Sequence, residues 1–227
     1  MLNKLLFALL LFLTIGCLNS KGQTNTYNTY LIEQQNFEFL KSKIGSKKLA
    51  SYEDIEGNAF LYKDFTTGYI KTTDGKTLKG KLRFNLYTNN VEFLKNEDVY
   101  ILDYNESFAG IKLGDYSIIK LNTDVANGYF FAYIIGKYNL ISKKSVRFIA
   151  EEEPKVYDTP KPSHFVNRKE KFFLLDSNSN FLEIKNIRKL KRSSNEMKKY
   201  INEYNEDNKL RAEKESLMDF FIWLNNQ

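Results

Sequence analysis

The sequence predicts a mainly β (α+β) protein: an antiparallel β-meander that forms a barrel or a sandwich, with an N-terminal helix and two or three C-terminal helices. From about Phe60 to Glu151, apolar and polar residues alternate with period two between short turn sequences, which is typical of antiparallel strands. After Ser193, apolar residues recur at helical spacing instead. The chain has 227 residues and 15% aromatic residues, enough to bury a core in one large or two small domains.

The first residues have the pattern of an export signal. A short basic start precedes the apolar run Leu5–Leu13, which is too short to span a bilayer. The small residues before Gln23 predict cleavage after Gly22, so that residues 1–22 are a signal peptide. An imperfect lipobox ending at Cys17 gives the alternative of a lipidated N-terminus. We therefore expect an exported protein in the periplasm or at the outer-membrane periphery of a Gram-negative bacterium.

The single cysteine and the single histidine restrict the chemistry of the exported chain. Cleavage before Gln23 would remove Cys17, so no disulfide and no thiolate zinc site is expected. Histidine-rich metal sites are excluded in the same way, because His164 is the only histidine. Dinucleotide and P-loop fingerprints are absent from the sequence, so we expect no cofactor. No later apolar run is long enough for a transmembrane helix.

Residues 23–56 are predicted to form a polar lead and a helix. Phe37, Leu40 and Ile44 recur at helical spacing within 30–44, and Gly45 is a plausible stop.

Residues 57–153 are predicted to form the meander. In the strand 77–87, Leu82 and Phe84 are expected to face the core while Lys81 and Arg83 face solvent. The segment 128–135 is apolar on both faces, which predicts a central strand covered on each side.

Residues 154–170 contain the three prolines of the chain and are predicted to be a loop. Residues 171–227 are predicted to form a β-hairpin and a helical tail packed on the same domain. In the tail, a capping-box pattern begins at Ser193, and one helical stripe leads to Tyr204 while a second spans Leu217 to Leu224.

Several of these segments also resemble a known group of proteins. The succession Gly57–Leu61 with Phe65 and Gly68 is followed by LRFNLYTNNVEF, by Tyr129-Phe130, by FFLLD and by a lysine-rich helical tail. Together they resemble a family of small exported β-meander proteins of unassigned function from Bacteroidota-type Gram-negative bacteria. The resemblance implies a signal peptide, a β-meander and a helical C-terminus, and it implies no catalytic residue.

Candidate catalytic groups are sparse. His164 follows Ser163, but no nucleophile-elbow motif occurs and adjacency in sequence does not align a base with a nucleophile. Two carboxylates would suffice for glycoside hydrolysis, although no spacing singles out a pair. The available carboxylates are Asp64, Asp103, Glu106 and Glu151–Glu153. We therefore predict no catalytic residue and no metal ligand.

Two other sets of residues could bind a partner. Tyrosines could line a concavity for sugar or lipid: Tyr100, Tyr104, Tyr116, Tyr129, Tyr133 and Tyr138. Basic residues form a candidate interaction patch: Lys185, Arg188, Lys189, Lys191, Arg192, Lys198 and Lys199. Export argues against nucleic acid, so an envelope protein or an anionic envelope component is the expected partner.

The sequence thus favours a non-enzymatic cell-envelope interaction or binding module. A β-barrel that binds a small lipid or saccharide is the first alternative, and a carboxylate-type hydrolase is the second.

Overall fold

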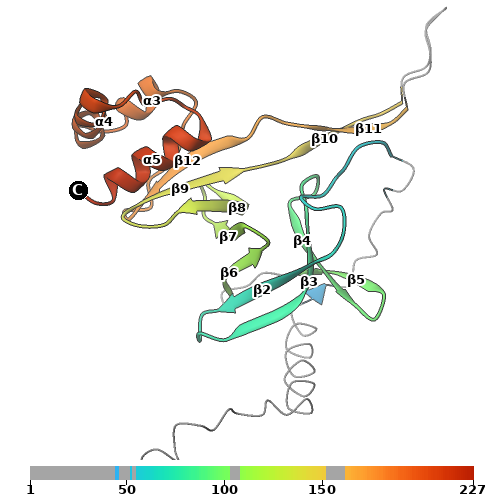
Figure 1. Ribbon diagram of the computed structural model, residues 1–227. Helices are drawn as coiled ribbons and strands as arrows, with labels where there is room; N and C mark the ends of the chain where they lie inside the picture. The colour runs from blue at the N-terminus through green and yellow to red at the C-terminus, as the bar shows by residue number, and fades with distance from the viewer. Residues whose placement is uncertain (1–43, 46–51, 53–54, 103–107, 152–161) are drawn as a thin grey trace, which may run out of the picture. The chain divides into compact units, whose positions relative to one another are not determined.

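The computed structural model describes residues 44–45, 52, 55–102, 108–151 and 162–227 (Figure 1). The elements in these residues are β1 (Ile44–Gly45), β2 (Thr66–Thr72), β3 (Thr77–Asn85), β4 (Asn90–Lys95), β5 (Asp98–Leu102), β6 (Phe108–Leu113), β7 (Tyr116–Asn122), β8 (Asn127–Ile134), β9 (Tyr138–Lys143), β10 (Val146–Ile149), β11 (His164–Asn167), β12 (Lys171–Asp176), β13 (Phe181–Glu183), α3 (Ile187–Lys191), α4 (Asn195–Asp207) and α5 (Lys214–Leu224).

The larger sheet consists of two antiparallel meanders that meet where β2 pairs with β6. Its eleven strands, of which β1 has two residues, follow the order β1-β5-β4-β3-β2-β6-β7-β8-β9-β12-β13. The predicted meander and the mainly β class are therefore confirmed. Of the two predicted forms, a barrel or a sandwich, the closed barrel is not formed by the described strands, because β1 and β13 lie at opposite edges of the sheet and the sheet stays open.

Aromatic contacts show that the open sheet is curved so strongly that side chains of its two meanders are in contact. The ring of Phe84 on β3 lies 5.1 Å from that of Phe131 and 5.9 Å from that of Tyr129, both on β8. The Tyr129 hydroxyl also donates to the carbonyl of Leu102, at the end of β5 (3.3 Å). Since β2, β6 and β7 separate β3 from β8 within the sheet, these contacts require strong curvature. Large buried side chains, among them Phe84 and Phe131, lie in the space enclosed by the curl.

The predicted alternation in β3 is confirmed with two exceptions, Arg83 and Asn85. Asn85 lies on the face predicted to be exposed, but it is fully buried and its side-chain amide donates to Glu92. Leu82 and Phe84 are fully buried and Lys81 is exposed, as period two requires. Arg83 was predicted to face solvent, and this is wrong. Its guanidinium contacts two aromatic rings and pairs with Glu92 of β4, whose side chain is 1% exposed.

The strand β8 is covered on both faces, as its apolar sequence predicts. Phe131 faces the enclosed core, while Phe130 belongs to a cluster on the other face with Ile141 and Phe173.

A long kinked hairpin joins the sheet to the smaller one. Strands β9 and β12 pair within the large sheet, and their continuations β10 and β11 pair as a two-stranded sheet. The prediction that residues 154–170 are wholly a loop is therefore wrong for His164–Asn167, which form β11. Between the two pairs of strands, the amide of Arg168 donates to the carbonyl of Ser145 (2.9 Å) and bridges the kink.

The C-terminal helices pack against the large sheet. Ser194 caps α4, its hydroxyl accepting from the amide of Met197 (3.0 Å). The apolar stripes of α4 and α5 pack with Tyr138 and Leu140 of β9 and Leu174 of β12 in one cluster. The three helices of the tail agree with the predicted two or three.

Most of the N-terminal predictions fall outside the described residues. These are the signal peptide 1–22, the cleavage site at Gly22 and Gln23, the alternative Cys17 and the helix in 30–44. The last residue of that predicted helix, Ile44, is described, and it lies in β1, which pairs with β5. In the described part of the chain, no helix combines the length and the apolar character needed to cross a membrane.

Candidate functional site

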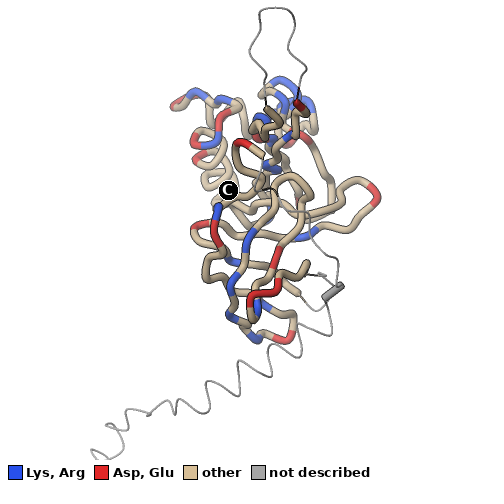
Figure 2. The backbone as a smooth tube through the Cα atoms, turned by 90° about the vertical axis from the view of Figure 1, so that its right-hand side faces the viewer, with Lys and Arg blue, Asp and Glu red and all other residues tan. Residues whose placement is uncertain are grey.

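The predicted basic patch lies on and around α3 and the first turn of α4. Lys and Arg positions are also found on strands, so charge alone does not mark the site (Figure 2). What distinguishes this region is a surface cavity of about 570 Å³, here called the basic cavity. Its lining residues are Arg188, Lys191, Arg192, Ser194, Asn195 and Lys198.

Local capping interactions position the basic cavity. Asn186 caps α3 by accepting from the amide of Lys189 (2.8 Å), and the Ser193 hydroxyl donates to the carbonyl of Leu190 (2.7 Å). Leu190 itself is fully buried in the helical cluster. Because Ser194 then starts α4, the end of α3 and the beginning of α4 are held in a tight corner. The basic side chains project around this corner.

The positive charge of the basic cavity is not neutralised by nearby acids. Within the described residues, no carboxylate forms an ion pair with Arg188, Lys191, Arg192 or Lys198. The nearest acid along the chain, Glu196, instead pairs with Lys137 (3.3 Å). Hydrogen bonds from Tyr138 and Lys137 lower the pKa of Glu196 despite some desolvation. The amino end of α4 adds its own partial positive charge to the cavity.

This arrangement suits phosphate, sulfate or carboxylate groups. Two guanidinium groups offer planar pairs of donors, and two ammonium groups add mobile positive charge.

The fold brings together four of the seven predicted patch residues. Lys185, Lys189 and Lys199 do not line the basic cavity, and Lys185 lies near Glu183 (3.7 Å). Ser194 and Asn195 line it but were not predicted as site residues, although the capping-box pattern at these positions is a signal that the chain turns there.

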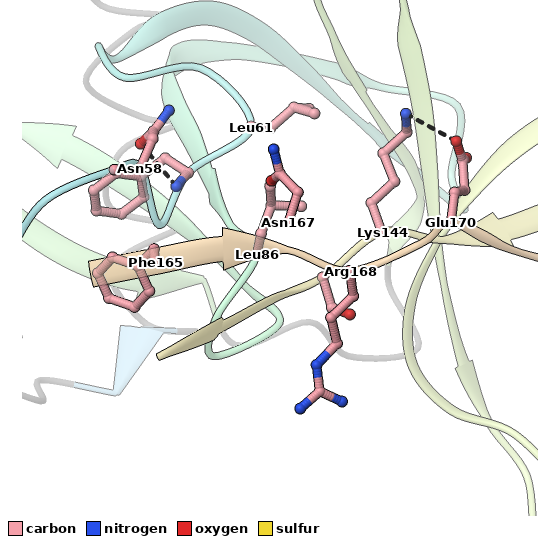
Figure 3. A pocket seen from close by; sticks show the side chains of 11 residues that line it. Asn58, Leu61, Leu86, Lys144, Phe165, Asn167, Arg168 and Glu170 are labelled. Atoms are coloured by element: carbon pink, nitrogen blue, oxygen red, sulfur yellow. Dashed lines mark hydrogen bonds and ion pairs between the residues drawn. The ribbon is translucent and has the colours of Figure 1, made fainter. Parts of the chain in front are cut away.

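A second cavity lies at the kink of the long hairpin, and Figure 3 shows the side chains that line it. It has a volume of about 470 Å³ between the loop at Gly57–Leu61 and residues 144–145 and 165–170. Lys144 and Glu170 point toward each other on one side (Nζ–Oε2 3.2 Å), while Asn58 and Asn167 lie on the other. We call this the kink cavity.

Glu170 is fully engaged within the kink cavity. Besides Lys144, its carboxylate accepts from the hydroxyls of Ser142 (2.5 Å) and Tyr133 (2.6 Å). Partial burial opposes ionisation of Glu170, but these hydrogen bonds and the ammonium of Lys144 lower its pKa on balance. Burial, followed by the hydrogen bond to Glu170, raises the pKa of Tyr133. The network thus holds an ionised carboxylate beside a neutral phenol and stabilises the kink.

Among the other candidate catalytic residues, those that the structure describes are not brought into a catalytic arrangement. The His164 ring nitrogen Nδ1 lies 2.9 Å from the carbonyl of Pro162, while the Ser163 hydroxyl accepts from the amide of Glu151. Asp64 borders a further cavity of about 440 Å³. Asp103, Glu106, Glu152, Glu153 and Tyr104 lie outside the described residues. In the part of the chain that the structure describes, no group of three or more acidic, histidine or cysteine side chains could hold a metal ion.

The five predicted tyrosines that lie in the described residues are dispersed and do not line one concavity. Tyr129 and Tyr116 pack on Phe84 and Phe131 respectively, in the enclosed core. Tyr138 instead packs on Tyr200 in the helical cluster. Tyr133 belongs to the Glu170 network, and Tyr100 is a partly buried residue of β5 opposite Phe93.

Comparison with protein-family models, with curated proteins and with solved structures finds no match to this chain.

Proposed function

We propose that the protein is an exported, non-enzymatic cell-envelope module that binds an anionic envelope component through the basic cavity. One observation supports this most directly: four cationic side chains border one cavity, and no described carboxylate pairs with any of them. Such uncompensated charge favours association with an anion and increases its rate of encounter.

The packing beneath the site supports a binding role. Met197, Ile201 and Tyr204 bury one side of α4 against the sheet and α5, while Lys198 remains exposed. The cations are therefore displayed from a rigid base, which reduces the entropy lost when a partner is bound.

The two alternatives have less support. A ligand inside the curled sheet would need space that is occupied by large buried side chains such as Phe84, Phe131 and Leu113. A carboxylate-type hydrolase would need a carboxyl group free to exchange a proton with substrate. Glu170, the acid in the kink cavity, is instead engaged by Ser142, Tyr133 and Lys144.

Two triple variants with the same change in net charge test the proposal. The cavity variant carries Arg188→Glu, Arg192→Glu and Lys198→Glu, and the control variant carries Lys185→Glu, Lys189→Glu and Lys199→Glu. The probe is short-chain inorganic polyphosphate, measured by isothermal titration calorimetry. We expect the cavity variant to bind roughly tenfold more weakly or worse than the control, because it loses convergent charge-assisted hydrogen bonds.

Salt dependence provides a second measurement. Wild-type affinity should fall as ionic strength rises, since exposed charges are screened over about 8–10 Å near physiological salt. Equal losses of affinity in the two triple variants would show that only diffuse charge matters, and would contradict a site at the basic cavity.

A further inference from the structure

Two large apolar side chains are exposed at the β8–β9 turn and on α5. Ile135, directly after β8, is 66% exposed, and Ile222 on α5 is 49% exposed. Contact of an isoleucine side chain with water is unfavourable in free energy, and the side chain is stabilised when it enters an apolar phase. We call this pair the apolar corner.

Asn225 links the two segments that carry the apolar corner through hydrogen bonds. Its side chain accepts from the amide of Tyr138 (3.0 Å) and donates to the carbonyl of the same residue (2.8 Å). A Cβ added at Gly136 would lie 2.5 Å from the Asn225 Oδ1, so the β8–β9 turn approaches the end of α5 closely. Ile135 adjoins Gly136, and Ile222 lies three residues before Asn225 on the same side of the helix.

An ion pair connects this turn to the basic cavity. Lys137, two residues after Ile135, contacts the Glu196 carboxylate (3.3 Å), and Glu196 follows the cavity residue Asn195. The apolar corner and the basic cavity are thus linked through one ion pair between the β8–β9 turn and the first turn of α4.

Resting on the proposed function, we propose that the anionic component is a phospholipid surface: the basic cavity receives lipid phosphates while Ile135 and Ile222 enter the interfacial region of the bilayer. Basic residues are attracted to anionic lipid surfaces, and adjacent apolar side chains gain by leaving water. A soluble polyanion would use only the basic cavity and would leave the apolar corner exposed.

The test uses vesicles of phosphatidylcholine with or without phosphatidylglycerol, and measures binding by co-sedimentation. The corner variant carries Ile135→Ser and Ile222→Ser. Its matched control carries Val125→Ser and Tyr69→Ser, two similarly exposed residues (67% and 44%), the first of them in the turn at the opposite end of β8 from Ile135. We expect the wild type and the control to bind vesicles with phosphatidylglycerol, and the corner variant to bind about tenfold more weakly.

Trp223, the only tryptophan of the chain, adjoins Ile222 and provides a local reporter. Brominated acyl chains should quench its fluorescence in the wild type and much less in the corner variant. The cavity variant should lose both vesicle binding and quenching.

The outcomes separate this proposal from the proposed function. If polyphosphate binding depends on the basic cavity but vesicles are not bound, or are bound equally by the corner variant, the membrane proposal is overturned and the partner is a soluble glycan or protein anion. If the cavity variant binds both polyphosphate and vesicles as the wild type does, both proposals fail.

Discussion

Arg83 and Glu92 form an ion pair across β3 and β4 that is almost enclosed by protein. The Nη2 and Nε of Arg83 both donate to Oε2 of Glu92 (2.6 and 2.9 Å), and Asn85 donates to the other carboxylate oxygen (2.9 Å). The guanidinium also lies over Phe60 and Phe65, at 3.6 and 4.2 Å from the ring centroids. A buried carboxylate is thus satisfied on both oxygens, as burial of charge requires.

Replacing Arg83 with alanine should destabilise the protein by about 3–5 kcal/mol, because Glu92 would remain buried without its cation. Urea denaturation measures the loss, with the exposed Lys81→Ala expected within about 0.5 kcal/mol of wild type. Equal stability of the two variants would mean that Glu92 does not depend on Arg83.

Leu82→Ala and Phe84→Ala should each cost about 2–5 kcal/mol, because both side chains are fully buried and leave cavities. Phe84 also loses its edge contacts with Tyr129 and Phe131, so its substitution should weaken packing between the two meanders. Denaturation monitored by circular dichroism tests this. A loss below about 0.5 kcal/mol at Phe84 would contradict the curled packing of the sheet.

The Glu170 network predicts a specific dependence of stability on pH. The folded-state pKa of Glu170 is lowered, so the ionised group stabilises the fold above its unfolded pKa, and this contribution is lost as pH falls through the folded pKa. Glu170→Gln should therefore cost about 1–3 kcal/mol at neutral pH and progressively less in acid. The exposed Glu203→Gln provides a control. A difference from wild type that stays constant from pH 7 to strong acid would exclude this role for the Glu170 charge.

The exported chain is expected to begin at Gln23. Intact-mass measurement on protein purified from its native host tests this prediction. A mass that fits an acylated Cys17 would instead establish a lipid anchor, which would place the basic cavity beside a membrane without any contribution from Ile135 and Ile222.

Local patterns were sufficient to predict the strands, the capped helix at Ser194 and the class of the fold. Period-two alternation predicts which face of β3 is buried. The capping-box pattern from Ser193 to Glu196 predicts the start of α4 to within one residue, since Ser194 and not Ser193 is the N-cap. Neither pattern determines how far a sheet curls or whether its edges meet, since these depend on contacts such as Phe84 with Phe131, 47 positions apart. For this reason the sequence left both a barrel and a sandwich open.

Like the fold, the candidate site could be predicted only in part from the sequence. A run of basic residues was visible in the sequence. The sequence does not show that Glu196 pairs with Lys137, so that no carboxylate among the described residues pairs with Arg192 or Lys198. The exposure of Arg83 was predicted wrongly for a similar reason. A charged residue on the outer face of a strand is usually solvated, but Arg83 is covered by the rings of Phe60 and Phe65, which come from a separate segment. The kink cavity had no sequence signal at all, because its lining combines residues 57–61 with residues 144–170.

The junction of β2 with β6 has a consequence for the order in which the chain folds. Most ladders of the large sheet join strands that are adjacent in sequence and can close over short turns. The β2–β6 ladder instead pairs Thr72 with Phe108 across the intervening strands β3, β4 and β5. Loop closure at that separation costs more entropy than closure of a hairpin, and non-local pairing slows folding. We therefore expect each meander to be able to form before the β2–β6 ladder, which then joins the two meanders into one cooperative domain.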